Sequence, residues 1–232
     1  MALSGAVLRL LPVALGYAEC ANVVLEWSDM EVLRPSLAKG GFAWALDALL
    51  QDYREAVLDL EAERTSAAGL SMTRLLHCAQ QALGPAVARL KRSIDMIRSF
   101  EKSAPCMQAL WDAWCDAIGV PDDRNAYALL VTGVTKSYME RIASWISGEE
   151  LSDPFDELFI VNTKQQQSAT GAAAAFDWAV RYALRTDDCY LPAFLREDAP
   201  VLLAVGKYAH LLRKLRYGDD ALKLALEFDG RS

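Results

Sequence analysis

The sequence is poor in the residues from which metal sites and nucleophilic active sites are built. It contains only two histidines, His77 and His210, and neither has a His or Cys partner at metal-ligand spacing on the same helical face. The cysteines are odd in number, far apart and never arranged as Cys-x-x-Cys, which disfavours a disulfide scaffold and fits buried thiols in a reducing cytosol. They are Cys20, Cys78, Cys106, Cys115 and Cys189.

Catalytic and nucleotide-binding motifs are also missing. The chain has no Gly-x-Gly-x-x-Gly, P-loop, His-Glu-x-x-His or Gly-x-Ser-x-Gly. Two acid pairs occur, Asp122-Asp123 and Asp187-Asp188, but neither is followed by a third carboxylate one turn later that could help hold a metal ion. We interpret both pairs as helix caps or loop residues. The sequence therefore predicts no enzyme, no catalytic, cofactor-binding or metal-binding residue, and no cofactor.

Long basic clusters and long apolar runs are lacking as well. The net charge is −7, and the longest basic cluster is Arg213–Arg216, so a nucleic-acid partner is not expected. No apolar run reaches the ~18–20 residues of a membrane span, so no membrane insertion is predicted. Arg9 interrupts the first apolar run, which argues against a signal peptide. We expect instead a short, buried first helix with Leu8, Leu11 and Leu15 on one face.

Strict apolar–polar alternation is absent, and apolar residues recur instead at steps of three and four. With 53% hydrophobic residues, this pattern predicts an all-α fold of helical bundles. A polar, Gln- and Ala-rich stretch at 161–175 is expected to be a flexible surface loop. Helices are predicted at 42–64, from a Ser71 cap to a break at Gly84-Pro85, at 87–97, 107–118 and 127–145 (ended by Gly148), from a cap at Ser152-Asp153-Pro154, at 176–184 and at 199–215.

One segment, from Lys136 to Ile160, resembles a signature of the gamma-tubulin complex component family. In that family a helix with a Tyr, a Trp and a final Gly leads into Leu-x-Asp-Pro-(Tyr/Phe)-x-Glu-Phe-Phe-Ile. Leu158 stands where the family usually has Phe. The matching residues include Tyr138, Trp145, Gly148, Asp153, Pro154, Phe155, Glu157 and Phe159.

Further segments resemble the same family in the same order along the chain. Within the family, the short stretch ahead of Tyr53 is most similar to component 4. Together the matches cover roughly residues 42–216. The segments are 49–61 with Tyr53 and Arg54, 190–195 with Leu191 and Pro192, and 199–207 with Gly206 and Lys207.

The resemblance implies a function in microtubule nucleation. Family members consist of two helical halves, and residues 1–232 correspond to the N-terminal one. That half would be a scaffold that makes lateral contacts with neighbouring complex components. Gamma-tubulin would bind through a C-terminal domain that we expect to be absent from this chain. The implied location is the cytoplasm and cytoskeleton, at a microtubule-organising centre such as the centrosome or spindle pole.

The motif residues are predicted to lie in the core or in lateral contacts. We interpret Trp145, Phe155 and Phe159 as core aromatics, with both phenylalanines folded back near Trp145. Asp153 is expected to cap a helix and Glu157 to be a solvated acid.

Gly206 is expected to permit close helix packing, since a glycine inside a helix otherwise costs about 1 kcal/mol.

Two other classes of function stay open. The first alternative is a helical adaptor, unrelated to gamma-tubulin, whose grooves bind partner helices. The second is an all-α enzyme, which the missing constellations disfavour.

Overall fold

The chain folds into two compact units, Met1–Ser137 and Tyr138–Ser232, in a computed structural model. Helices dominate both units, so the all-α prediction is confirmed. The structure describes residues 2–28, 36–65, 69, 71–153, 155–163, 181–185 and 187–217.

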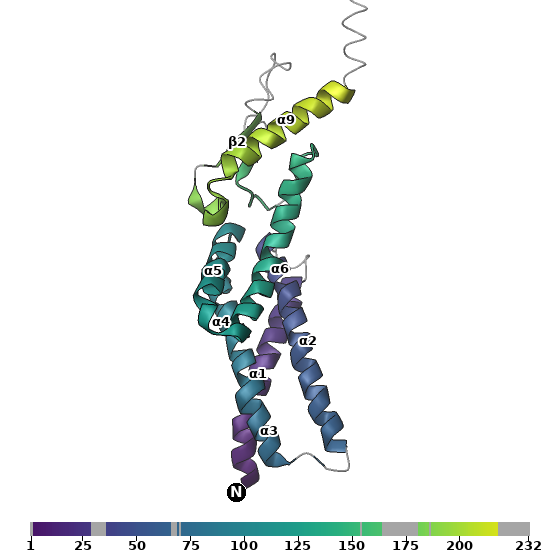
Figure 1. Cartoon of the computed structure of the whole chain (residues 1–232), viewed down its shortest axis with the longest axis vertical. Helices are drawn as coiled ribbons and strands as arrows, with labels where there is room; N and C mark the ends of the chain where they lie inside the picture. Colours follow the sequence, from purple (N-terminus) through teal and green to yellow (C-terminus); the bar gives the residue numbers. More distant parts are fainter. Residues whose placement is uncertain are drawn as a thin grey trace, which may run out of the picture. The chain divides into compact units, whose positions relative to one another are not determined.

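The first unit is a bundle in which α1 packs against both α2 and α4, and α2 also contacts α5 (Figure 1). Its largest fully buried side chains include Phe42, Leu46, Leu50, Ile97 and Met107. Its elements are α1 (Ala2–Ser28), α2 (Leu37–Thr65), α3 (Met72–Cys78), the π-helix η1 (Ala79–Leu83), α4 (Gly84–Arg98), α5 (Ser103–Asp116), the 3-10 helix η2 (Ala117–Gly119) and the first part of α6 (Pro121–Ile146).

Glycines allow α2 to touch α6 within this unit. A Cβ on Gly41 would overlap the carbonyl oxygen of Gly133, and a Cβ on Gly133 would lie 2.6 Å from the Cβ of Ala45. The absence of a side chain at both positions brings the two backbones together. A buried hydrogen bond adds a link between α2 and α5, where the amide of Ala38 donates to Ser103 Oγ at 3.0 Å.

Two features of the first unit differ from the sequence expectations. Ser71 does cap α3, where its hydroxyl accepts from the amide of Arg74. However, the chain does not break at Gly84-Pro85, because a π-turn carries α3 directly into α4. The Gly84 amide donates to the Ala79 carbonyl in this π-turn, and Pro85 follows at the start of α4.

The prediction of a short, buried first helix is wrong. α1 extends over 27 residues, and Leu8, Leu11 and Leu15 are all exposed. Segment Val7–Ser28 is also long and apolar enough to cross a membrane by length and composition alone. The expectation that no stretch reaches that limit is therefore wrong, although core helices and signal sequences pass the same test.

The second unit joins the end of α6 to a small antiparallel sheet and to α9. Strand β1 (Ile160–Asn162) pairs with β2 (Tyr182–Leu184), and Ile160 lies opposite Leu184. Two 3-10 helices, η3 (Asp188–Tyr190) and η4 (Ala193–Leu195), lead into α9 (Ala199–Tyr217). The helix α6 covers the predicted 127–145 and ends as expected before Gly148, whose φ is 88°. The amide of Glu149 reaches back to the carbonyl of Ser144, as in a Schellman cap.

Three expectations for this unit need correction. After Ser152, the described residues 153 and 155–159 form a turn and no helix, and Ile160–Asn162 form β1. Of the predicted loop 161–175, Val161 and Asn162 belong to β1, and residues 164–175 lie outside the described residues. Of the predicted helix 176–184, residues 182–184 form β2, and residues 176–180 lie outside the described part. The pairing of two distant short segments overrode their local helical pattern.

The adjacent glycines at the start of α2 allow a matched test of the α2–α6 contact. In Gly41→Ala the new Cβ would meet the Gly133 carbonyl, and we expect a loss of about 1–3 kcal/mol in the free energy of unfolding. Gly40→Ala is the control, because no atom lies within 4 Å of its Cβ and alanine favours a helix by about 1 kcal/mol. Urea unfolding of both variants measures the difference. Equal stabilisation by both would show that the helices do not touch at Gly41.

Candidate functional site

Trp145 is the centre of the second unit. Its side chain is fully buried, with its ring 5.5 Å from the ring of Tyr182 on β2 and 6.0 Å from the ring of His210 on α9. A Cβ on Gly206 of α9 would overlap the indole, so only glycine allows α9 to approach this closely. One tryptophan thus connects the end of α6, the small sheet and α9.

Gly148 and α9 reinforce this connection. The carbonyl oxygen of Gly148 accepts a hydrogen bond at 2.8 Å from Arg213 Nη1, which lies two helical turns after Gly206 on the same face of α9. Lys207, the neighbour of Gly206 in the family motif, is half-buried. The resemblance therefore marks the residues that position α9 on the end of α6.

Asp153 organises the turn that follows. Its two carboxylate oxygens accept from the amides of Glu157 and Leu158, at 2.9 and 3.0 Å. Asp156 adopts a left-handed φ of 55° within this turn, and its carboxylate pairs with Arg185. Asp153 therefore caps a turn that leads into β1, and the expected helix cap is wrong because no helix follows.

The aromatic residues of the motif divide between two places. Phe159 is fully buried, as predicted for a core aromatic. We had expected its ring to pack near Trp145, but it pairs with the ring of Tyr138, with the centroids 6.4 Å apart. Tyr138 donates through its hydroxyl to the carbonyl of Tyr190 at 3.0 Å, and burial raises the pKa of Tyr138. Phe155 is half-buried.

The remaining motif residues of the second unit have varied surroundings. Glu157 is only 2% exposed, so its interpretation as a solvated acid is wrong. Pro192 is buried immediately ahead of η4, and Leu191 beside it is half-buried. Pro154 lies outside the described residues.

Tyr53 and Arg54, the motif residues of the first unit, fasten α2 to α1. The rings of Tyr53 and Tyr17 stack with their centroids 4.7 Å apart. Arg54 donates to the Tyr17 hydroxyl at 2.8 Å and pairs with Asp47 at 3.0 Å. These contacts hold two long helices in register and leave the other side of Tyr53 facing a cavity.

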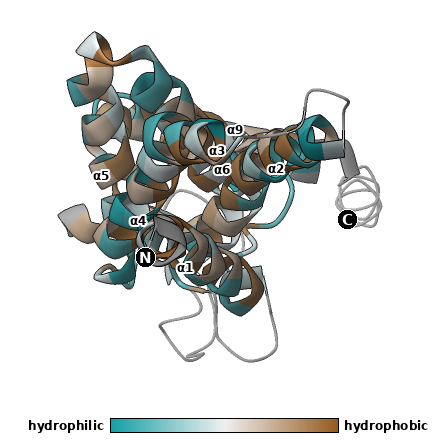
Figure 2. Cartoon of the chain, turned by 90° about the horizontal axis from the view of Figure 1, so that it is seen from below, coloured by the Kyte–Doolittle hydropathy of each residue, from teal (hydrophilic) through white to brown (hydrophobic). Residues whose placement is uncertain are grey.

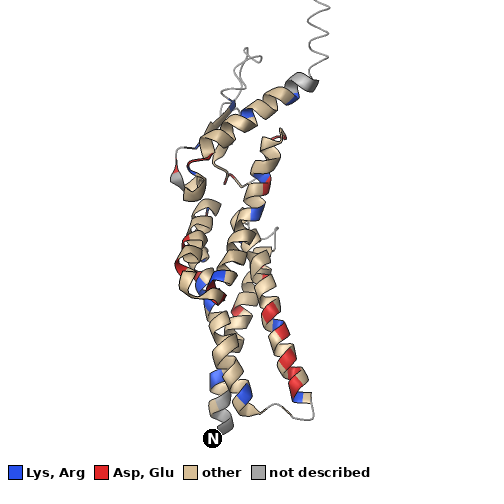
Figure 3. Cartoon of the chain, viewed as in Figure 1, with Lys and Arg blue, Asp and Glu red and all other residues tan. Residues whose placement is uncertain are grey.

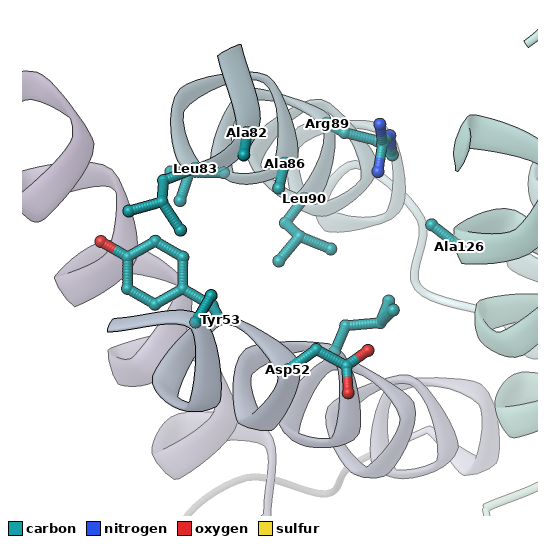
Figure 4. A pocket seen from close by; sticks show the side chains of 11 residues that line it. Asp52, Tyr53, Ala82, Leu83, Ala86, Arg89, Leu90 and Ala126 are labelled. Atoms are coloured by element: carbon teal, nitrogen blue, oxygen red, sulfur yellow. The ribbon is translucent and has the colours of Figure 1, made fainter. Parts of the chain in front are cut away.

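That cavity lies between α2 and α4, has a volume of about 210 Å³ and is lined mainly by leucine and alanine (Figure 4). Small side chains such as Ala82 and Ala86 leave the space open. The C-terminal half of α2, which forms one edge of the cavity, carries many acidic residues (Figure 3). Arg89, on the α4 side, is paired with Asp123 at 2.5 Å. The cavity has the size and lining for an apolar side chain.

An exposed apolar stripe runs along α9. Its residues are spaced by four, three and four positions, so they share one helical face. Monomeric proteins seldom expose such a row, which makes it a candidate contact surface. The stripe consists of Val201, Val205, Tyr208 and Leu212, exposed by 61%, 44%, 60% and 64%.

Neither acid pair gathers the ligands of a metal site. Asp122 and Asp123 lie in the first turn of α6, and Asp187 accepts from the amide of Cys189 at 3.0 Å. Within the described residues, no group of three or more His, Cys, Asp or Glu side chains could hold a metal ion. What the described part of the molecule does offer is close helix packing and exposed apolar faces.

Comparison with known proteins agrees with this picture. The family described as "Gamma tubulin complex component N-terminal" matches residues 1–229. The chain belongs to this family. It is also similar to gamma-tubulin complex component 2 of Arabidopsis thaliana, with 25% identity over 181 residues. The match covers 77% of this chain and 26% of that protein, so the chain spans about a quarter of the relative's length.

Several motif residues of the second unit, among them Trp145 and Gly206, are buried, whereas the α9 stripe is exposed. Sequence reasoning found the buried frame of this gamma-tubulin complex component domain but missed the α9 stripe. Its spacing of four, three and four residues was visible in the sequence. The sequence did not reveal that the face of α9 with Gly206 packs on Trp145, which leaves the stripe on the exposed face.

Truncation of Trp145 tests its central role. We expect Trp145→Ala to lower the free energy of unfolding by ~3–5 kcal/mol, the usual cost of emptying a large aromatic site. Gly206→Ala should also destabilise, since its Cβ would overlap the indole. Thermal and urea unfolding followed by circular dichroism measure both. An unchanged melting temperature with lost partner binding would make Trp145 an interface anchor instead.

His210 predicts a pH dependence of stability. Desolvation and the positive charge of Arg181 lower its pKa from the ordinary 6.5. The folded state therefore disfavours the protonated ring, and the unfolded state binds more protons as the pH falls through that value. We expect the free energy of unfolding to decrease from about pH 7 to pH 5, and His210→Phe to reduce this slope.

Proposed function

We propose that this chain acts as a scaffold subunit of a gamma-tubulin complex, and that its helical domain associates laterally with neighbouring components during microtubule nucleation. The observation that carries this proposal is the family match over residues 1–229. The relative with 25% identity is itself a gamma-tubulin complex component. The proposed location follows, at the cytoskeleton and a microtubule-organising centre.

The chemistry of the described residues supports a scaffold and not an enzyme. Of the motif residues, Tyr138, Trp145, Glu157 and Phe159 are buried, where they determine helix packing. Both acid pairs have structural roles. Asp122 and Asp123 lie in the first turn of α6, where Asp123 pairs with Arg89, and Asp187 accepts a hydrogen bond from the amide of Cys189 in a turn. A domain built in this way contributes shape and surface.

The α9 stripe is the surface that we propose for lateral contact. Its four apolar residues lie on the face away from Gly206, which is turned toward Trp145. Tyrosine is enriched among the anchors of protein interfaces, and the aliphatic side chains beside Tyr208 would exclude water around it. Gamma-tubulin itself is proposed to bind a region of the family that lies outside the quarter matched here.

Binding measurements with purified proteins test the proposal. We expect the chain to bind the N-terminal half of another gamma-tubulin complex component. Val205→Glu combined with Tyr208→Glu should weaken that binding at least about tenfold. Ile118→Glu is the control, because Ile118 is 70% exposed in the other unit. Gamma-tubulin alone should not bind with sub-micromolar affinity.

Two outcomes would contradict the proposal. Tight binding of gamma-tubulin by this chain would overturn the assignment of that contact to another region. Failure of the folded chain to bind any complex component would favour the adaptor alternative, for which the cavity between α2 and α4 is the candidate groove.

A further inference from the structure

α1 has a second apolar face that the first unit leaves uncovered. Its inner face is buried through Gly16, Cys20, Val23 and Trp27, spaced by four, three and four residues. A different set, which we name the outer seam, is exposed along its whole length. Figure 2 colours α1 and the other helices by hydropathy, with hydrophobic residues in brown. The outer seam consists of Leu8, Leu11, Leu15, Ala18, Asn22 and Leu25.

The spacing of the outer seam is that of a two-helix coiled coil. Its steps are three, four, three, four and three residues, so Leu8, Leu15 and Asn22 occupy a positions of a heptad. Leu11, Ala18 and Leu25 occupy d positions. The four leucines are 47–71% exposed, whereas the inner face of the same helix is buried in the bundle. We propose that the outer seam pairs in parallel with the outer seam of a second copy of this chain.

Asn22 borders a polar hollow that Lys91, Asp95 and Arg98 of α4 also line, and its place on the outer seam favours a second copy as the occupant. In a parallel, in-register pair, Asn22 faces the Asn22 of the other chain, and each amide can donate to and accept from the other. In an antiparallel pair centred on the seam, Asn22 would face Leu11 and its amide would lose its partner. A single polar a position of this kind sets register and pairing in coiled coils.

The charges beside the outer seam fit the same arrangement. One edge carries Glu19 and Glu26, and Glu19 is paired with Lys91 at 2.5 Å. The other edge carries the uncharged Ala14 and Ala21. In a parallel pair each acidic edge lies against the uncharged edge of the other chain, so like charges do not oppose each other.

A lipid bilayer is a poorer occupant of this face. Asn22, Glu19 and Glu26 lie on or beside it, and charged side chains are costly in hydrocarbon.

The size of the seam predicts a weak dimer. Its 18 residues span about 27 Å. With its two edges, the seam offers about half of the 20–30 residues that each partner contributes to a standard interface. Association should therefore depend strongly on concentration. This inference does not rest on the proposed function, and it concerns the first unit.

Sedimentation equilibrium of the full 232-residue chain tests the pairing. Over about 1–200 µM, where a weak interface is populated, the mean mass should rise from 25.6 kDa toward the dimer. Leu11→Glu combined with Leu15→Glu should weaken dimerisation at least about tenfold, because two carboxylates per chain would enter the seam. Ile118→Glu, exposed to a similar extent, should have no effect.

A cross-link tests the orientation independently of those charges. Asn22→Cys should form a disulfide-linked dimer under mild oxidation, since only a parallel, in-register pair brings the two positions together. The unchanged chain, with its exposed Cys115, is the control. A dimer whose Asn22→Cys form does not cross-link would overturn the parallel arrangement.

Two results would overturn the proposal as a whole. One is a single monomeric mass at all concentrations for a chain that circular dichroism shows to be folded. The other is flotation of the chain with vesicles of phosphatidylcholine and phosphatidylserine, lost in the double variant, without dimerisation in solution. The first would leave the seam without this partner, and the second would assign it to lipid.

Discussion

Both units depend on helices that approach each other closely at glycine residues. In the first unit, Gly41 and Gly133 bring the backbones of α2 and α6 together. In the second unit, Gly206 accepts the indole of Trp145 against the backbone of α9. Helices packed this closely leave little room for adjustment, because a core at crystal-like density resists even one added methylene. The contact of Gly206 with Trp145 turns the opposite face of α9 outward.

The sequence predicted the long amphipathic helices well because their periodicity extends over several turns. The 127–145 pattern lies inside α6 (Pro121–Ile146), and the helix ends before Gly148 as its turn geometry requires. Predictions failed where one local signal had two possible uses. Asp153 accepts from two backbone amides, as a helix cap does, but it stabilises a turn ahead of β1. Tyr182–Leu184 pairs with a strand some twenty residues away, which local periodicity does not encode.

The candidate sites show the same division between what sequence can and cannot reveal. Resemblance identified Trp145 and Gly206, and their contact in the structure explains why both residue types are needed there. It did not reveal that Glu157 is buried or that Phe159 pairs with Tyr138. Nor could it distinguish the two faces of α1, since both are apolar. Burial of Cys20, Val23 and Trp27 settles which face belongs to the bundle.

An exposed apolar face is stable in water only if its cost is offset within the fold or removed by a partner. The α9 stripe belongs to the second unit and the outer seam of α1 to the first, so each unit presents one such face. A scaffold that pairs through one face and contacts a neighbour through the other gains avidity, because the first contact raises the local concentration for the second. Each interface can then remain weak and reversible while the assembly as a whole persists. The net charge of −7 opposes non-specific association, so assembly depends on specific, well-placed contacts.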